Sequence, residues 1–191
     1  MAPGYRVYFC GDCSGVKGQH GVGLAVKEEI VKNAGKDGIA IECISARLLK
    51  VRFSIQSTFV TFVIAYAPTE DATDGEKAKY MAALNSTVKP VPSREHVFVL
   101  TDANARTEKR GEGGRKADSK VLGAYGRDVL NENGKLLLRF AEDNKLALLN
   151  TFFSNPERGV LYTFQAPTAG RAKHASTTSS RSRRTADWSA A

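Results

Sequence analysis

The 191-residue sequence has no apolar run long enough to cross a membrane. Its longest apolar stretches, such as Phe59 to Ala67, fall well short of the roughly 20 residues that a spanning helix needs. The first residues, Met1 to Arg6, also lack the apolar core of a signal peptide. These absences predict an intracellular protein, nuclear or cytoplasmic, with no membrane partner.

Cysteine and histidine are scarce, with three of each. Cys10 and Cys13 have the C-x-x-C spacing of half a zinc site, but a closed zinc site needs four ligands and no second pair follows. Three cysteines do not favour a disulfide framework either. We therefore expect unpaired cysteines in a strand-to-loop segment, and we expect His20 and His96 to pack or to face water.

Acidic residues are few near the C-terminus. From Arg171 onward, five basic residues face one acid, so this stretch carries +4 of the net charge of +8. After His174, residues 175–184 are Ser, Thr and Arg with one Ala and no large apolar side chain, which predicts a disordered tail over 174–191 after a domain over 1–173. A basic excess attracts phosphate backbones, so DNA is the expected partner.

Short strands joined by turns dominate the first two thirds of the chain. Leu49, Val51, Phe53 and Ile55 alternate with polar residues, which predicts a half-buried strand over 46–55. Thr58 to Tyr66 is nearly all β-branched or aromatic, which predicts a strand covered on both faces. Two residues separate these runs, which favours a hairpin. Further strands are expected at 5–10, 22–26, 96–100, 146–149 and 160–164.

Two helices are expected between these strands. Thr73 and Glu76 have the spacing of a capping box, and apolar residues recur at helical spacing as far as Val88. Residues 133–144 read as a second helix, which would bury Leu136, Leu137, Phe140 and Ala141. Residues 105–128 are polar and glycine-rich, which predicts a long loop.

Two strand ends carry side chains suited to phosphate chemistry. One strand ends at Tyr66 before Pro68, and another delivers Asp102 and Asn104. An aspartate can take a proton from water, while an amide and a phenol can donate to phosphate oxygens. Asp and Asn two apart on extended backbone would point to the same side. The alternative is that Asp-Ala-Asn is merely a turn, since both residues favour turns.

Several motifs carry a resemblance to a known family. They are Tyr66-Ala67-Pro68, Asp102-Ala103-Asn104-Ala105, Gly18 to Val26, Asn131-Glu132-Asn133-Gly134, Leu148 to Phe153, and Tyr162 to Pro167. In order and spacing, from about Gly4 to about Lys173, they resemble the apurinic-endonuclease-like branch of the endonuclease/exonuclease/phosphatase superfamily. The sequences of these motifs are similar to those of non-LTR retrotransposon endonucleases and of their domesticated relatives named craniofacial development protein 2.

The resemblance implies a fold and a reaction. The fold would be a DNase I-like α/β sandwich, with two stacked mainly antiparallel sheets flanked by helices. The reaction would be Mg²⁺-dependent hydrolysis of DNA, in which Asp102 activates water while Asn104 and Tyr66 orient the phosphate. Asp102 and Asn104 would also be the metal-site residues that remain.

The chain also departs from the family pattern. Thr101 and Ala103 occupy positions at which the family usually has Gly and Phe. The segment with the metal-binding glutamate should precede Tyr5, and the closing R-L-D-Y and S-D-H segments are missing. We therefore expect a domain incomplete at both ends, with weakened Mg²⁺ binding, impaired catalysis, exposed sheet edges and poor solubility.

The tail has a possible explanation at the DNA level. If the codons from His174 to Trp188 are read one register off, ordinary codon choices spell R-L-D-Y-I-L-T-K-Q-A-D-R-R-L, which is the missing family segment. We hypothesise a frameshift after Lys173, which the coding DNA decides directly. The alternative to a nuclease is a non-catalytic nucleic-acid-binding remnant.

Overall fold

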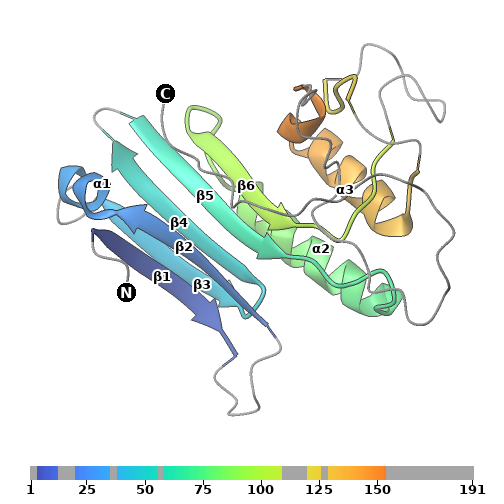
Figure 1. Ribbon diagram of the computed structural model, residues 1–191, viewed down its shortest axis with the longest axis horizontal. Helices are drawn as coiled ribbons and strands as arrows, with labels where there is room; N and C mark the ends of the chain where they lie inside the picture. Colours follow the sequence, from blue (N-terminus) through green and yellow to red (C-terminus); the bar gives the residue numbers. More distant parts are fainter. Residues whose placement is uncertain are drawn as a thin grey trace, which may run out of the picture. The chain divides into compact units, whose positions relative to one another are not determined.

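The computed structural model describes residues 4–12, 20–34, 38–55, 58–108, 120–125 and 129–153 (Figure 1). The described residues belong to one compact unit, Met1–Ser154. The strand expected at 160–164 and the tail at 174–191 lie outside the described residues. No helix in the described ranges is both long and apolar enough to cross a membrane.

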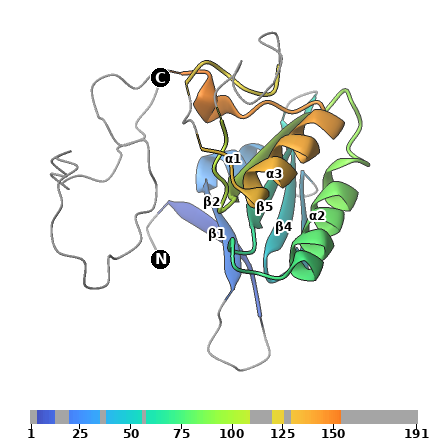
Figure 2. The same cartoon turned by 90° about the vertical axis from the view of Figure 1, so that its right-hand side faces the viewer.

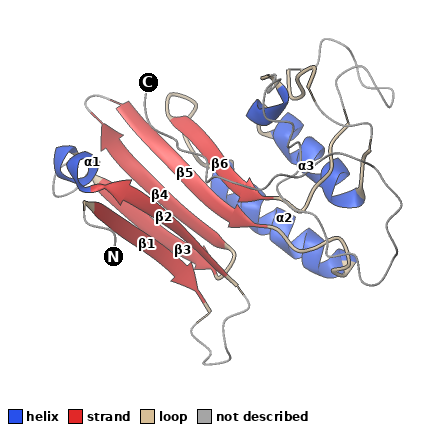
Figure 3. Cartoon of the chain, viewed as in Figure 1, coloured by secondary structure: helices blue, strands red, loops and turns tan. Residues whose placement is uncertain are grey.

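The described residues form an α/β fold with two sheets, consistent with an α/β sandwich (Figure 3). The smaller sheet pairs β1 (Tyr5–Gly11) with β2 (Gly21–Lys27) in antiparallel register. The larger sheet has the order β3 (Ile39–Ser45), β4 (Leu48–Ile55), β5 (Thr58–Tyr66), β6 (His96–Asp102). Its first three strands are antiparallel, and β6 runs parallel to β5.

Strand β5 is buried on both faces, as its β-branched sequence predicts. On one face Ile64 joins Val51 and Phe53 of β4 in a core shared with the β1–β2 sheet. On the other face Val63 packs with residues of the helices α2 (Asp74–Val88) and α3 (Glu132–Asp143). Figure 2 shows both helices on the same side of β4 and β5. The predicted hairpin is confirmed, since Ile55 pairs with Thr58.

Local signals set the ends of α2. The Thr73 hydroxyl accepts the backbone N–H of Glu76, and the Glu76 carboxylate accepts the backbone N–H of Thr73, so the predicted capping box is present. The helix ends at Val88, shortly before Pro90, because proline lacks the N–H that would continue the helix. A short helix α1 (Glu28–Asn33) and strand β3 were not among the predicted elements.

In the C-terminal half, one expectation is confirmed in part and another is wrong. In α3 Phe140 and Ala141 are buried as expected, whereas Leu136 and Leu137 are half-buried and the buried Leu138 was not predicted. Residues 146–149 do not form a strand: Lys145 has a positive φ of 56° after α3, and the chain then enters a 3₁₀ turn at Leu149–Thr151. One backbone bond, from Leu148 N–H to the Val121 carbonyl, replaces the expected strand ladder.

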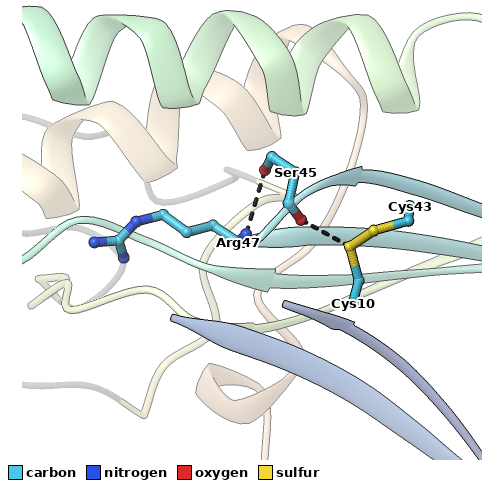
Figure 4. The surroundings of a disulfide bond; sticks show 4 residues. All are labelled: Cys10, Cys43, Ser45 and Arg47. Carbon is cyan, nitrogen blue, oxygen red and sulfur yellow. Dashed lines mark hydrogen bonds between the residues drawn. A yellow bond between two sulfur atoms is a disulfide. The ribbon is translucent and has the colours of Figure 1, made fainter. Parts of the chain in front are cut away.

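The expectation of unpaired cysteines is also wrong for two of the three. Cys10 of β1 and Cys43 of β3 form a disulfide with a Cα–Cα distance of 5.6 Å (Figure 4). The two residues are 33 positions apart in sequence, so they meet because the β1–β2 sheet packs over β3 and β4. The bond links the two sheets, next to a bulge in β3 between Cys43 and Ser45. Cys13 lies outside the described residues.

Candidate active site

Tyr66 and Asp102 lie side by side at the ends of two parallel strands. They are register partners as the last residues of β5 and β6, and the Ala67 N–H donates to the Asp102 carbonyl at 2.9 Å. In parallel strands, paired residues direct their side chains to the same face. Tyr66 packs on the side of the inter-sheet core, and Asp102 is exposed. The two residues therefore emerge together at one edge of the sheet.

Asn104 joins them through a turn and not through extended backbone. Its φ is 45°, and its N–H donates to Asp102 Oδ1 at 3.2 Å, so Asp102 to Asn104 is an Asx-type turn. The expectation of an extended Asp-x-Asn is therefore wrong, and the turn alternative describes the backbone. The Asn104 side-chain amide donates to the Ala67 carbonyl at 3.0 Å. The turn thus folds Asn104 back onto the loop that follows Tyr66.

The start of α3 fastens these two loops to each other. The buried Asn133 amide donates to the carbonyls of Pro68, at 3.0 Å, and Asn104, at 3.2 Å. Asn131 caps the helix by accepting the Gly134 N–H at 2.8 Å, and its own amide donates to Glu70 Oε2 at 2.8 Å. Asn131 to Gly134 carried part of the family resemblance, and the hydrogen bonds give this motif a structural role at the candidate site.

The sequence analysis did not identify Arg47, which lies in the turn between β3 and β4. Its guanidinium donates to the carbonyls of Tyr66 and Ala67, both at 3.3 Å, and lies 4.9 Å from the centre of the Tyr66 ring. His20 Nε2 is 3.0 Å from Arg47 Nη2. No sequence signal marks Arg47, because only the packing of the turn against the end of β5 brings it here.

Tyr80 of α2 is a second phenol beside the site. Burial raises the pKa of Tyr80 above its ordinary value, while its hydrogen bond with Thr101 and the charge of Arg47 oppose the rise. The negative charge of Asp102 adds to it. The Tyr80 hydroxyl therefore stays protonated at neutral pH and acts as a hydrogen-bonding group there.

The described residues do not by themselves fit a magnesium centre. In the ranges that the structure describes, no three His, Cys, Asp or Glu side chains gather as a metal site. At the strand ends Asp102 supplies a carboxylate, and its Oδ1 already accepts the Asn104 N–H. Mg²⁺ prefers an octahedral set of oxygen ligands anchored by carboxylates, and one exposed aspartate is a weak anchor for it.

A small apolar cavity lies beneath this edge, between the strand ends and the two helices. Its volume is about 20 Å³, and its walls include Pro68, Tyr80, Met81, Thr101 and Leu137. That is room for about one water molecule, so the cavity is too small for a nucleotide. Tyr66, Asp102 and Asn104 are not among the residues that line it.

The fold and the strand-end residues thus define an α/β protein with polar groups gathered at one sheet edge. No family model matches the chain. It is 30% identical over 163 residues to craniofacial development protein 2 of Bos taurus and 29% identical over 163 residues to that of Tragulus javanicus. These alignments cover 85% of the chain but 25% and 26% of the two relatives, so the chain spans about a quarter of their length. The similarity supports the part of the sequence resemblance that concerns craniofacial development protein 2.

Proposed function

We propose that this chain is a retrotransposon-derived DNA endonuclease domain with a DNase I-like fold, which keeps the phosphate-orienting residues but is impaired in cleavage. The observation that supports it most is the register of β5 and β6, which pairs Tyr66 with Asp102 at one sheet edge. The similarity to craniofacial development protein 2 agrees with one part of the sequence resemblance on which the proposal rests.

The three residues share two tasks in this proposal. The exposed Asp102 carboxylate accepts a proton from an attacking water molecule. The Tyr66 hydroxyl donates to a phosphate oxygen, and Asn104 uses the amide hydrogen that does not bond Ala67 for the same purpose. Asp102 and Asn104 are the residues that would hold Mg²⁺, and we propose only weak binding, because no group of three metal-binding side chains gathers among the described residues. A bound Mg²⁺ would supply charge neutralisation at the phosphate.

Cleavage is expected to be very slow. The family's metal-binding glutamate and its charge-stabilising His/Asp pair have no counterpart among the motifs of this sequence. Each such group typically contributes about 10²- to 10⁴-fold to the rate, so a chain without these groups should cleave DNA several orders of magnitude more slowly than one that has them.

Plasmid nicking in the presence of Mg²⁺ tests this function. Supercoiled DNA incubated with the full chain should show no more nicking than with Asp102→Ala. Asp143→Ala is the matched control, because Asp143 is an exposed aspartate at the end of α3. Nicking that survives Asp143→Ala and disappears with Asp102→Ala would show a competent active site and contradict the impairment.

The second candidate is a non-catalytic nucleic-acid-binding protein, favoured by the net charge of +8 and by the basic C-terminal stretch. Its affinity for DNA should fall steeply with salt and should not change with Asp102→Ala. A protein that does not bind DNA at low salt would exclude both candidates.

A further inference from the structure

The turn between β3 and β4 places a cation beside the candidate site. We propose that Arg47 and His20 form a phosphate-binding subsite next to Tyr66, which takes a phosphodiester of nucleic acid. The identity of this occupant rests on the proposed function, whereas anion binding by the subsite does not.

Arg47 forms no direct ion pair with a described carboxylate, although its charge contributes to lowering the pKa of the Glu76 carboxyl. Nη1 donates to the two carbonyls, and Nη2 directs one hydrogen to His20. The hydrogen on Nε and the second on Nη2 have no partner among the described residues. A guanidinium with such free hydrogens is well suited to the fork geometry of a phosphate.

His20 positions the Arg47 guanidinium. Arginine cannot accept a hydrogen bond, so His20 Nε2 must accept from Arg47 and the imidazole carries its proton on Nδ1. Nδ1 is buried and has no hydrogen-bond partner among the described residues. Buried polar atoms are nearly always hydrogen-bonded, so this one indicates a missing acceptor. Because Nδ1 lies on the side of the ring away from Arg47, the free hydrogens of Arg47 are the donors proposed for the phosphate, and His20 holds the guanidinium in place.

The subsite adjoins the residues proposed to orient the scissile phosphate. Arg47 lies over the Tyr66 ring, and the His20 and Tyr66 ring centres are 6.1 Å apart. Arg47 and Asp102 shift the pKa of the same Tyr80 hydroxyl in opposite directions, so both charges lie near it. A DNA strand bound at Tyr66 could thus place one phosphate against Arg47 while another faces Asp102.

A purely structural role for Arg47 makes a different prediction. Arg47 also clamps its turn to the end of β5 through the two carbonyl bonds, and Figure 4 shows its side chain extending away from the disulfide. If clamping were the whole role, its replacement would change stability without moving the position at which phosphate binds.

The test is a titration of the isotope-labelled full chain with inorganic phosphate, without Mg²⁺, followed by ¹⁵N–¹H NMR. Shifts should centre on Arg47, His20 and Tyr66, and Arg47→Gln should weaken phosphate binding at least about tenfold. Arg47→Lys keeps the charge but loses the paired N–H donors of the guanidinium. Its phosphate affinity should lie between those of wild type and Arg47→Gln. Arg139→Gln, which removes an exposed charge from α3, is the matched control and should leave affinity unchanged.

Two results would overturn the proposal: equal phosphate affinity in Arg47→Gln and wild type, or wild-type shifts that centre elsewhere. If Arg47→Gln does not fold, the wild-type shift map alone decides. The phosphate titration separates the subsite from the nuclease, because it contains neither Mg²⁺ nor DNA and its outcome does not depend on whether the wild-type chain nicks plasmid DNA. Anisotropy with a fluorescein-labelled DNA duplex then tests the occupant: Arg47→Gln should weaken duplex binding more than Arg139→Gln does.

Discussion

At the scale of single residues, the candidate site depends on residues that hold its loops in place. Asn133 holds the loops after β5 and β6 together by donating to a carbonyl of each. Its neighbour Gly134 lets α3 approach the loop closely, because a Cβ at this position would collide with the carbonyl of Arg106. The orientation of Asn104 therefore depends on how closely the helix start can pack.

Replacing Gly134 tests this close approach. Gly134→Ala should lower the free energy of unfolding by about 1–3 kcal/mol, the usual cost of inserting a methyl group into a packed site. Gly75→Ala is the matched control, because a Cβ there meets nothing within 4 Å, and the change should be neutral or slightly stabilising. Urea unfolding of the two variants measures the difference, and equal effects would show that the contact at Gly134 is not tight.

A second residue-scale prediction concerns pH. Arg52 donates to both oxygens of Glu95, at 2.8 and 2.7 Å, and these bonds hold the pKa of Glu95 below its ordinary value of 4.5, although burial opposes them. Because the folded pKa is lowered, the pair stabilises the fold above pH 4.5 and this contribution is lost as pH falls through the folded pKa.

Glu95→Gln should therefore flatten the fall of stability with acid, as measured by thermal unfolding across that pH range. Glu42→Gln is the control, because the Glu42 carboxylate is 63% exposed beside Lys50. If the stability of Glu95→Gln falls with decreasing pH as steeply as that of wild type, the lowered pKa of Glu95 does not contribute to the acid dependence.

At the scale of the elements, patterns that depend on near neighbours were predictable. The alternation of β4, the two-sided burial of β5, the hairpin between them and the Thr73 capping box all follow from local sequence, and the structure has each of them. Residues 146–149 show the limit of this reasoning. Their apolar run favours a strand, but after the positive φ of Lys145 the chain turns, and a short 3₁₀ helix follows at Leu149.

Features that depend on tertiary packing were not predictable from the sequence. Arg47 reaches Tyr66 because the turn before β4 packs against the end of β5. Cys10 meets Cys43 because one sheet lies over the other. The juxtaposition of Tyr66 and Asp102 was inferable in part, since strands that run parallel end at the same edge. The left-handed turn at Asn104 was not.

The disulfide gives a prediction at this scale. Cross-linking residues 33 positions apart should stabilise the fold by about 3–4 kcal/mol in the chain-entropy account. Cys43→Ser should lower the unfolding midpoint accordingly, and a reductant should lower that of wild type but not of the variant. Mass spectrometry of unreduced peptides should find Cys10 linked to Cys43. A free Cys43 in the folded protein would contradict the pairing.

At the scale of the whole molecule, the net charge and the exposed apolar side chains favour different kinds of association. The net charge of +8 favours contact with a polyanion. Large apolar side chains are exposed on the outer strands, including Phe9 at 69% and Leu100 at 45%. Exposed apolar strands are a predicted source of aggregation. DNA binding experiments therefore need dilute protein and a record of its oligomeric state.

The most direct measurement of the central claim compares two tyrosines in DNA binding. Tyr66→Phe removes the hydroxyl that is proposed to donate a hydrogen bond to a phosphate oxygen. Tyr5→Phe removes a hydroxyl from an exposed tyrosine of β1. In fluorescence anisotropy with a labelled duplex, Tyr66→Phe should weaken binding by about five- to tenfold, the value of one hydrogen bond, and Tyr5→Phe should leave it unchanged. Equal affinities for wild type and both variants would show that phosphate does not bind at Tyr66.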